Sequence, residues 1–410
     1  MVSVARPPSA AMSVADARAK LLEGLCPLPG EDVTLTLALG RVLAGEVRAQ
    51  TDLPGTDNSA MDGYAVVSAE IAGATATSPV RLARGAESRA GHPAPEHRAG
   101  TATLIATGAP IPRGADAVVA FEQTEQEGAA VVFAAEADSG QHIRNRGEDI
   151  CAGTVVMAAG RRLRSVDLGV CAAAGLARVR VARRPRVALL SSGDELVEPG
   201  TAPQPHQVTD VNSAMLAAAV QEAGGVPVPL GVVGDDRSAV LLALEKARDS
   251  ADLVVSSAGV SMGGHDHVRD CVAQLGSVDL WTVAMRPGKP LVIGRVGQTP
   301  FVGLPGNPVS SAVTFLLFAR AAILALQGAD RLLPRTLPVV LGEPFEKPAH
   351  LETYLRVRLE SNGRDLVARS SGGQGSAMMH GLGAAEALLV LPVGGSSFPC
   401  GAPATALQLP

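Results

Sequence analysis

Short apolar runs alternate with helical stretches between residues 186 and 328, and this alternation constrains the fold more than any other feature of the sequence. The apolar runs cover 187–190, 226–230 and 253–255, and the helical stretches cover 212–223 and 236–248. Nearly continuous apolar strands at this spacing are typical of a parallel sheet that is covered on both faces, so the sequence predicts a doubly wound α/β domain. Ligands of such sheets bind at the carboxyl ends of the strands.

The rest of the chain has a different texture. Short β-type runs, separated by Gly, Pro and charged turns, predict a small β domain over residues 51–137 and a separate barrel or sandwich from Leu332 onward. Near the N-terminus, Ser13 is expected to cap an amphipathic helix that ends close to Gly24. Residues 33–48 alternate between apolar and polar as a strand does.

Composition and charge exclude several classes of function. The 410 residues include 45 Gly and 29 Pro but only 7 Phe, 2 Tyr and 1 Trp, and the net charge is −5. Such a chain lacks the aromatic platforms and the positive charge that nucleic-acid binding uses. The five cysteines form no C-x-x-C pair, which favours reduced structural cysteines. The start has no apolar signal core and the apolar run 309–326 contains Arg320, so we expect a buried helix, no membrane partner and a cytoplasmic protein.

Polar turns rich in small residues follow the predicted strands of the α/β domain. They are Ser191–Glu195, Ser256–Asp266, Arg286–Pro290 and Gly303–Pro308. Small residues let backbone N–H groups approach an anion, the last turn opens a helix with a positive end, and Arg286 and Lys289 add cations. Each turn alone is compatible with a purely structural turn, and Asp266 alone is compatible with a helix cap. His265 and His267 are more typical of a solvated loop than of a zinc site. Together the turns predict a phosphorylated ligand.

Carboxylates recur in further polar segments. Asp57–Ala65 and Arg144–Asp149 lie outside the α/β domain, where Thr107–Pro112 adds a hydroxyl. Asp235 and Asp236 begin a helix, where capping is the default interpretation. Carboxylates beside a phosphate site are compatible with Mg²⁺ between them, because this ion takes one or two carboxylates together with phosphate oxygens. An acidic chain can therefore bind an anionic ligand.

Taken in order, these motifs closely resemble the molybdopterin molybdenumtransferase family, which includes MoeA and the gephyrin E domain. They are D-N-S-A-M-D-G-Y-A from Asp57, T-G-A-P-I-P from Thr107, R-G-E-D from Arg146, S-S-G-D-E-L from Ser191, G-V-S-M-G-x-x-D from Gly259, R-P-G-K-P from Arg286 and G-L-P-G-N-P-V-S from Gly303. Each string alone is a weak pattern, but seven in order are highly specific.

The resemblance implies an α/β plus β architecture and an elongated homodimer whose site lies at the subunit interface. Its four domains would be a MogA-like α/β domain, a small inserted β domain, a discontinuous mixed N-terminal linker domain and a C-terminal β-barrel. The corresponding residues are 186–328, 51–137, 1–50 with 138–185, and 329–410. The implied reaction inserts molybdate into adenylylated molybdopterin with Mg²⁺ and releases AMP.

The resemblance also assigns roles to residues. Catalytic roles are implied for Asp62, Thr107, Asp149, Glu195, Asp235 and Asp266, of which Glu195, Asp235 and Asp266 are the expected magnesium ligands. Substrate and molybdate binding is implied for Ser192, Gly193, Gly259, Ser261, Arg286, Lys289, Pro290, Pro305, Gly306, Asn307, Pro308, Arg356 and Ser376.

Two positions depart from the family pattern. Arg286 stands where the family usually has Lys, so the charge is kept but a planar fork replaces a compact ammonium. Ala258 stands where the family usually has Gly, and its Cβ is expected to be tolerated only if φ there is negative.

Two other functions remain open at this point. A molybdopterin adenylyltransferase resembles the 186–328 unit alone, so the flanking β segments favour insertion. A gephyrin-like scaffold would keep the architecture for binding partners, and the two departures would fit it. An adenylyltransferase that delivers substrate and proteins that accept the cofactor are possible partners.

Overall fold

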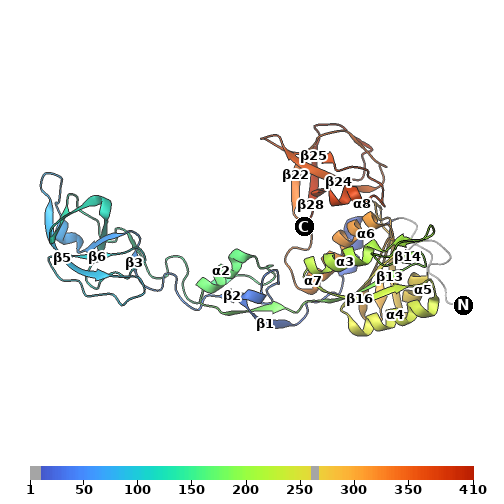
Figure 1. Cartoon of the computed structure of the whole chain (residues 1–410), viewed down its shortest axis with the longest axis horizontal. Coiled ribbons are helices and arrows are strands. Elements are labelled where there is room, and N and C mark those ends of the chain that lie inside the picture. The colour runs from blue at the N-terminus through green and yellow to red at the C-terminus, as the bar shows by residue number, and fades with distance from the viewer. Residues whose placement is uncertain (1–10, 260–266) are drawn as a thin grey trace.

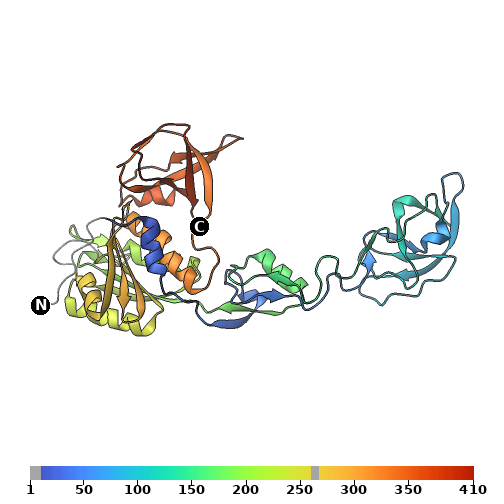
Figure 2. The same ribbon diagram turned by 180° about the vertical axis from the view of Figure 1, so that it is seen from behind.

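The computed structural model describes residues 11–259 and 267–410 of the chain. The molecule is elongated (Figure 1). An α/β unit and a β-barrel lie together at one end, a small β unit lies at the other, and a narrow linker unit joins them, as Figure 2 also shows from behind.

Six strands form the sheet of the α/β unit, in the order β16-β13-β17-β21-β20-β18. Their bounds are β13 (Arg186–Ser192), β16 (Val226–Val233), β17 (Leu253–Ser257), β18 (Gly276–Thr282), β20 (Pro290–Val296) and β21 (Thr299–Leu304). The strands β16, β13, β17 and β21 are parallel, which confirms the predicted α/β class. The sheet is nevertheless mixed, because a tight turn with Gly297 at φ +59° connects β20 to β21 as an antiparallel hairpin, and β18 is antiparallel to β20.

Helices cover both faces of this sheet. The helices are α1 (Val14–Leu22), α3 (Val211–Glu222), α4 (Arg237–Ser250) and α5 (His267–Leu275). Alternate residues of β13 face opposite sides: Val187 packs in a core with α1 and α3, while Ala188 packs with α4 and α5. The Ser13 side chain accepts a hydrogen bond from the Asp16 N–H, which confirms the predicted cap of α1.

One long apolar helical stretch forms the centre of the first core. It comprises α6 (Pro308–Thr314), the π-helical turn η4 (Phe315–Ala319) and α7 (Arg320–Leu326). Among the described residues this is the one helix long and apolar enough to cross a membrane, but 83% of its most apolar window is buried inside the protein. It is therefore the core helix that the sequence predicts.

The C-terminal strands close into a barrel. The order β24-β25-β22-β28-β26 is completed by a further pairing of β26 with β24, so five strands form a ring. Their bounds are β22 (Thr336–Leu341), β24 (Glu352–Ser361), β25 (Leu366–Ser370), β26 (Ala387–Leu391) and β28 (Pro403–Gln408), accompanied by β23 (Phe345–Glu346), β27 (Ser397–Phe398) and α8 (Met379–Gly383). The short strand β19 (Met285–Arg286) leaves the α/β unit and pairs in parallel with β24.

The distant unit is a six-stranded sheet with a core of its own, in the order β7-β4-β6-β5-β9-β8. The strands are β4 (Gly63–Val66), β5 (Val80–Ser88), β6 (Thr101–Ile105), β7 (Ala117–Ala120), β8 (Thr124–Glu127) and β9 (Ala130–Phe133), with the 3₁₀ turns η2 (Ser68–Ile71) and η3 (Phe121–Gln123). The short β-type runs that the sequence predicts within residues 51–137 coincide with β5, β6, β7 and β9 of this sheet.

The linker unit is built from short pairings between distant segments. They are β1 (Gly30–Thr34) with β12 (Arg178–Ala182), β2 (Val47–Arg48) with β11 (Val155–Met157) and β3 (Asn58–Ser59) with β10 (Ile143–Arg144), beside helix α2 (Ser165–Ala173). The expected strand over 33–48 is wrong. After β1 the chain forms the 3₁₀ turn η1 (Leu35–Leu37) and turns at Gly40, φ +73°, so its apolar residues belong to several short contacts.

Candidate functional site

The carboxyl ends of three parallel strands form the wall of a cavity of about 720 Å³. Ser192 ends β13, Ser257 ends β17, and the Pro305–Pro308 turn follows β21. The predicted residues that line this cavity are Ser192, Glu195, Gly259, Pro290, Pro305, Gly306, Asn307 and Pro308. Its described lining contains the acidic residues Glu195 and Asp210 and no Lys or Arg.

The turn after β17 is strained. Ala258 has φ +73° and the following Gly259 has φ +79°, so the expectation of a negative φ at Ala258 is wrong. The Ala258 N–H donates to the Leu304 carbonyl at 3.1 Å, and this contact holds the turn against the end of β21. A non-glycine residue in this region is uncommon and is found preferentially at functional sites.

A second cavity, of about 460 Å³, adjoins the first and shares Pro290, Pro305 and Asn307 with it. Arg286, Lys289 and Ser376 are the other predicted residues that line it. The side chains of Arg286 and Lys289 are exposed and make no hydrogen bond or ion pair to any residue that the structure describes, so both charges can bind an anion.

The barrel positions one wall of this second cavity. Arg286 lies in β19 opposite Thr353 of β24, and Asn307 Nδ2 donates to Ser376 Oγ at 3.1 Å. The Val309 N–H donates to the Ser376 carbonyl at 3.0 Å. The α/β unit and the barrel therefore meet at the residues predicted to bind molybdate.

Arg356 supports the loop that carries Ser376 and lines neither cavity. Its side chain is fully buried, and Nη2 donates to the carbonyls of Gly373 at 2.6 Å and Gly375 at 3.1 Å. Burial lowers the pKa of Arg356. Gln374 also supports this loop, because its side chain accepts a hydrogen bond from the Arg356 N–H and donates one to the Arg356 carbonyl.

The expected magnesium ligands are only partly described. The exposed carboxylate of Glu195 lines the first cavity and has no hydrogen-bond partner, whereas Asp235 lies in the turn before α4 and donates its N–H to Asp194 Oδ1 at 3.0 Å. Asp266 and Ser261 lie outside the described residues. Within 11–259 and 267–410, no three His, Cys, Asp or Glu side chains form a metal-binding group.

Gly193 lies beside this carboxylate. It adopts φ +146°, and a Cβ there would lie 2.7 Å from Glu195 Oε2. Glycine at this position therefore lets the Glu195 side chain fold against the backbone.

Three predicted residues lie away from both cavities, Asp62 and Thr107 in the distant unit and Asp149 in the linker unit. Asp62 Oδ1 accepts a hydrogen bond from the Thr107 N–H at 2.7 Å. The segment that ends in Asp149 begins with β10, which pairs with β3 of the Asp62 motif. All three side chains are exposed. Figure 1 shows the linker unit between β6, which precedes Thr107, and β13, which precedes Glu195.

Some residues of the site carry no sequence motif. Asn212 lines the first cavity and joins two strand ends, because its Nδ2 donates to Ser257 Oγ at 2.7 Å and to the Gly306 carbonyl at 2.8 Å. Thr353 lines the second cavity with a buried hydroxyl that has no partner. Asn212 follows a predicted strand–helix junction, a position that could have suggested it; Thr353 has no such signal.

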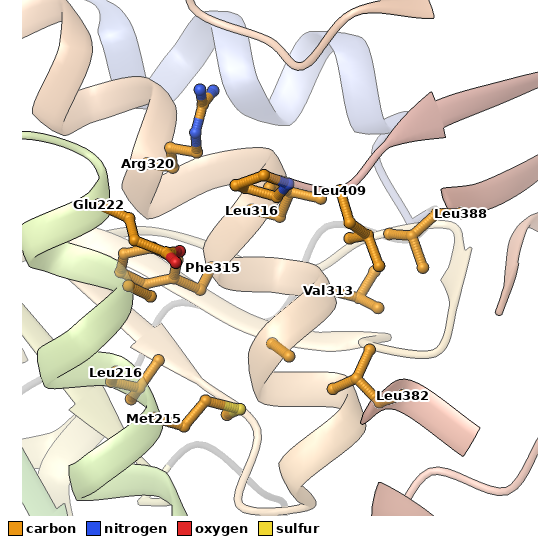
Figure 3. A pocket seen from close by; sticks show the side chains of 13 residues that line it. Met215, Leu216, Glu222, Val313, Phe315, Leu316, Arg320, Leu382, Leu388 and Leu409 are labelled. Atoms are coloured by element: carbon orange, nitrogen blue, oxygen red, sulfur yellow. The ribbon is translucent and has the colours of Figure 1, made fainter. Parts of the chain in front are cut away.

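An apolar pocket nearby lacks the features of this site. It has a volume of about 200 Å³ and lies between α3, the 308–326 helix and the barrel. Figure 3 shows its wall of Leu216, Val313 and Leu382. Apart from Glu222 and Arg320 its lining is apolar, so the two polar cavities are the candidate site.

Replacing Ala258 by Gly is expected to raise the free energy of unfolding by up to about 1 kcal/mol. The left-handed conformation costs an L-residue about 1–2 kcal/mol, and the greater backbone freedom of glycine offsets about 0.5–1 kcal/mol of the gain. Urea denaturation measures the change. Gly259→Ala is the matched control: its Cβ would lie 2.3 Å from Val268 Cγ2, so it should destabilise. A lower stability of A258G would contradict the strain at this turn.

Comparisons with known proteins identify the family of this chain. Residues 12–175 match the model of the MoeA N-terminal region (domain I and II), 188–325 that of a probable molybdopterin binding domain, and 338–409 that of the MoeA C-terminal region (domain IV). The chain is 38% identical to molybdopterin molybdenumtransferase 2 of Mycobacterium tuberculosis, over 88% of this chain and 90% of that protein. It is 37% identical to the molybdopterin molybdenumtransferase of a Nostoc species, over 93% and 89%.

A solved structure shares the whole architecture. The molybdopterin biosynthesis MoeA protein of Pyrococcus horikoshii OT3 superposes with a TM-score of 0.86 at 26% identity, over 98% of this chain and all of that one. Three family models match the chain in order, and relatives above 30% identity match it over most of their length. Both findings assign the chain to one family. The chain belongs to the molybdopterin molybdenumtransferase family and is a transferase of molybdenum cofactor biosynthesis.

Proposed function

We propose that this transferase inserts molybdate into adenylylated molybdopterin in a magnesium-dependent reaction that releases AMP. The observation that carries the proposal is the pair of adjoining cavities with different charge. The first offers Glu195 and Asp210, and the second offers Arg286, Lys289 and Lys347 against Glu346 alone. One substrate contains a pyrophosphate link and the other is a separate oxyanion, so the reaction needs two adjoining cavities of different charge.

The first cavity suits the pyrophosphate with a magnesium ion. Glu195 presents an unpartnered carboxylate, and Mg²⁺ is commonly held by one or two carboxylates together with substrate phosphate oxygens, so this residue fits the ion. When bound, the ion would neutralise charge on the phosphates. Asp235 and Asp266 are the further carboxylates that we propose on this side, with Ser192 and the Gly259 turn against the phosphates.

The second cavity suits molybdate. Arg286 and Lys289 hold the oxyanion by charge-assisted hydrogen bonds, and Asn307 and Ser376 add neutral donors at the shared wall. A molybdate oxygen or a water attacks the phosphorus of the adenylyl group, the pyrophosphate link breaks, and AMP leaves. The two cavities adjoin, so the dithiolene end of the substrate can reach the bound molybdate after AMP has left.

We further propose that the site is completed in a homodimer. Asp62 and Thr107 lie in the distant unit and Asp149 lies in the linker unit, and the length of the molecule separates the distant unit from the sheet of β13, which precedes Glu195 (Figure 1). A second copy placed antiparallel brings its distant unit to this site, as an isologous contact allows. Asp62, with its hydrogen bond from the Thr107 backbone, then orients the reacting groups beside Asp149.

The four structural units are proposed as the family's domains, with boundaries at 1–50 with 138–185, 51–137, 186–328 and 329–410. The reaction joins small metabolites made inside the cell, so we propose a cytoplasmic enzyme. An adenylyltransferase would supply the substrate, and molybdoenzymes would accept the product.

Glu195→Gln is expected to lower the rate of AMP release at least about 100-fold, the typical effect of removing one charged group that stabilises a transition state. The assay supplies purified protein with adenylylated molybdopterin, molybdate and Mg²⁺, and chelation of Mg²⁺ should abolish the rate. Glu198→Gln is the matched control, since Glu198 is exposed on the same segment and lines neither cavity. Full activity of E195Q, or of the wild type without Mg²⁺, would contradict the proposal.

Arg286→Ala is expected to raise the molybdate concentration for half-maximal AMP release about 10- to 100-fold, the equivalent of one hydrogen bond to a charged group. Arg286→Lys restores the residue usual in the family and should change this concentration by only a few fold, because the charge remains. Molybdate titrations of the wild type, R286A and R286K measure this concentration. An unchanged midpoint in R286A would remove Arg286 from the oxyanion site.

A further inference from the structure

A cavity of about 790 Å³ lies away from the proposed active site, where three parts of the chain meet. Its walls come from the segment 161–165 of the linker unit, from α7, and from the segment 329–335 that leads to the barrel. Six arginines line it: Arg161, Arg162, Arg164, Arg320, Arg331 and Arg335. They are spread over 175 positions of the sequence, so no motif reveals them.

Two of these arginines share one carboxylate within the protein. Arg161 Nη2 lies 2.6 Å from Asp167 Oδ1, and Arg164 Nε lies 3.2 Å from Asp167 Oδ2. The Asp167 carboxylate is buried, and although burial raises its pKa, hydrogen bonds from the two arginines outweigh this effect and lower it. This pairing is therefore already satisfied.

The other four arginines have no carboxylate partner in the described chain. Arg162 donates to the backbone carbonyls of Gly40 at 3.1 Å and Glu222 at 2.6 Å, and Arg320 donates to the carbonyl of Leu332 at 3.1 Å. The guanidinium groups of Arg331 and Arg335 are exposed and make no hydrogen bond or ion pair with residues 11–259 or 267–410. Asp330 is the one carboxylate on the lining, so the six arginines face two carboxylates in all, those of Asp330 and Asp167, and four positive charges are uncompensated.

Among these four arginines, Arg320 carries its charge in the least favourable surroundings. Figure 3 shows its guanidinium pointing away from the apolar wall at Leu316 and Val313. Burial, together with the nearby Arg162, lowers the pKa of Arg320, and the charge of Glu222 offsets only part of this effect, so the Arg320 charge is incompletely compensated. A bound anion would supply that compensation.

We propose that this cavity binds an oligophosphate anion with three or more negative charges, either free or carried by a nucleoside triphosphate. Arginine forks bind phosphate oxygens in bidentate pairs, and four uncompensated charges match a triphosphate better than a single carboxylate. The volume is within the range of small-molecule sites. Leu39, Leu163 and Leu333 add apolar contact on the wall.

The site is separate from the proposed active site. The helix 308–326 begins at Pro308 in the first cavity and reaches the basic cavity at Arg320, twelve residues later. At 1.5 Å per residue these positions are roughly 18 Å apart along the axis. The basic cavity contacts the linker unit that carries the distant carboxylates, so an anion bound here would fix the linker against the α/β unit.

Titration calorimetry of the full chain with tripolyphosphate, without Mg²⁺, tests the proposal. The background is Arg286→Ala/Lys289→Ala, in which the oxyanion cavity has lost its free cations, so failure of the proposed reaction would not affect the result. One equivalent of tripolyphosphate should bind, and adding Arg331→Ala/Arg335→Ala should weaken binding at least 10-fold. The control Arg113→Ala/Arg364→Ala removes two exposed, unpartnered arginines elsewhere and should leave binding unchanged.

Further probes identify the ligand and its place. ATP binding as tightly as tripolyphosphate indicates a nucleotide, tripolyphosphate alone indicates a free oligophosphate, and inorganic phosphate should bind far more weakly than either. Hydrogen exchange should slow in 161–165 and 329–335 when the ligand is present. No binding in the background variant, or equal loss in the R331A/R335A and control proteins, would overturn the proposal.

Discussion

The parallel alignment of β13, β17 and β21 is the constraint on which the rest of the site depends. Parallel strands bring their carboxyl ends to one edge of the sheet, so three turns far apart in sequence become neighbours. Asn212 ties two of these turns together through Ser257 and the Gly306 carbonyl. The strained Ala258 turn is held within the same contacts, and the acidic cavity follows from this arrangement.

The barrel adds what the sheet alone lacks. Pairing of β19 with β24 positions Arg286, and the bonds of Asn307 and Val309 to Ser376 join the two units around the second cavity. Arg356, buried behind this loop, holds the carbonyls of Gly373 and Gly375. The proposed active site therefore requires a fixed contact between the two units, and the isolated α/β unit would lack half of it.

Much of this fold could be predicted from the sequence because local patterns determine it. The cap at Ser13, the strand–helix alternation and the polar turns all depend on neighbouring residues. The failures depend on distant ones: residues 33–48 are divided among several partners, and Ala258 keeps a positive φ because its turn is fixed against β21. The roles of Asn212 and Thr353, and the arginines gathered around Arg320, likewise require knowledge of which segments meet.

The central claim is that one active site combines the sheet edge of one subunit with the distant unit of the other. Heterodimers of Asp62→Ala and Glu195→Ala chains, purified through two different tags, test it most directly by their rate of AMP release. Each homodimer should be inactive, whereas the heterodimer contains one site with both residues intact and should recover about half of the wild-type rate. A heterodimer as inactive as either parent would contradict the claim.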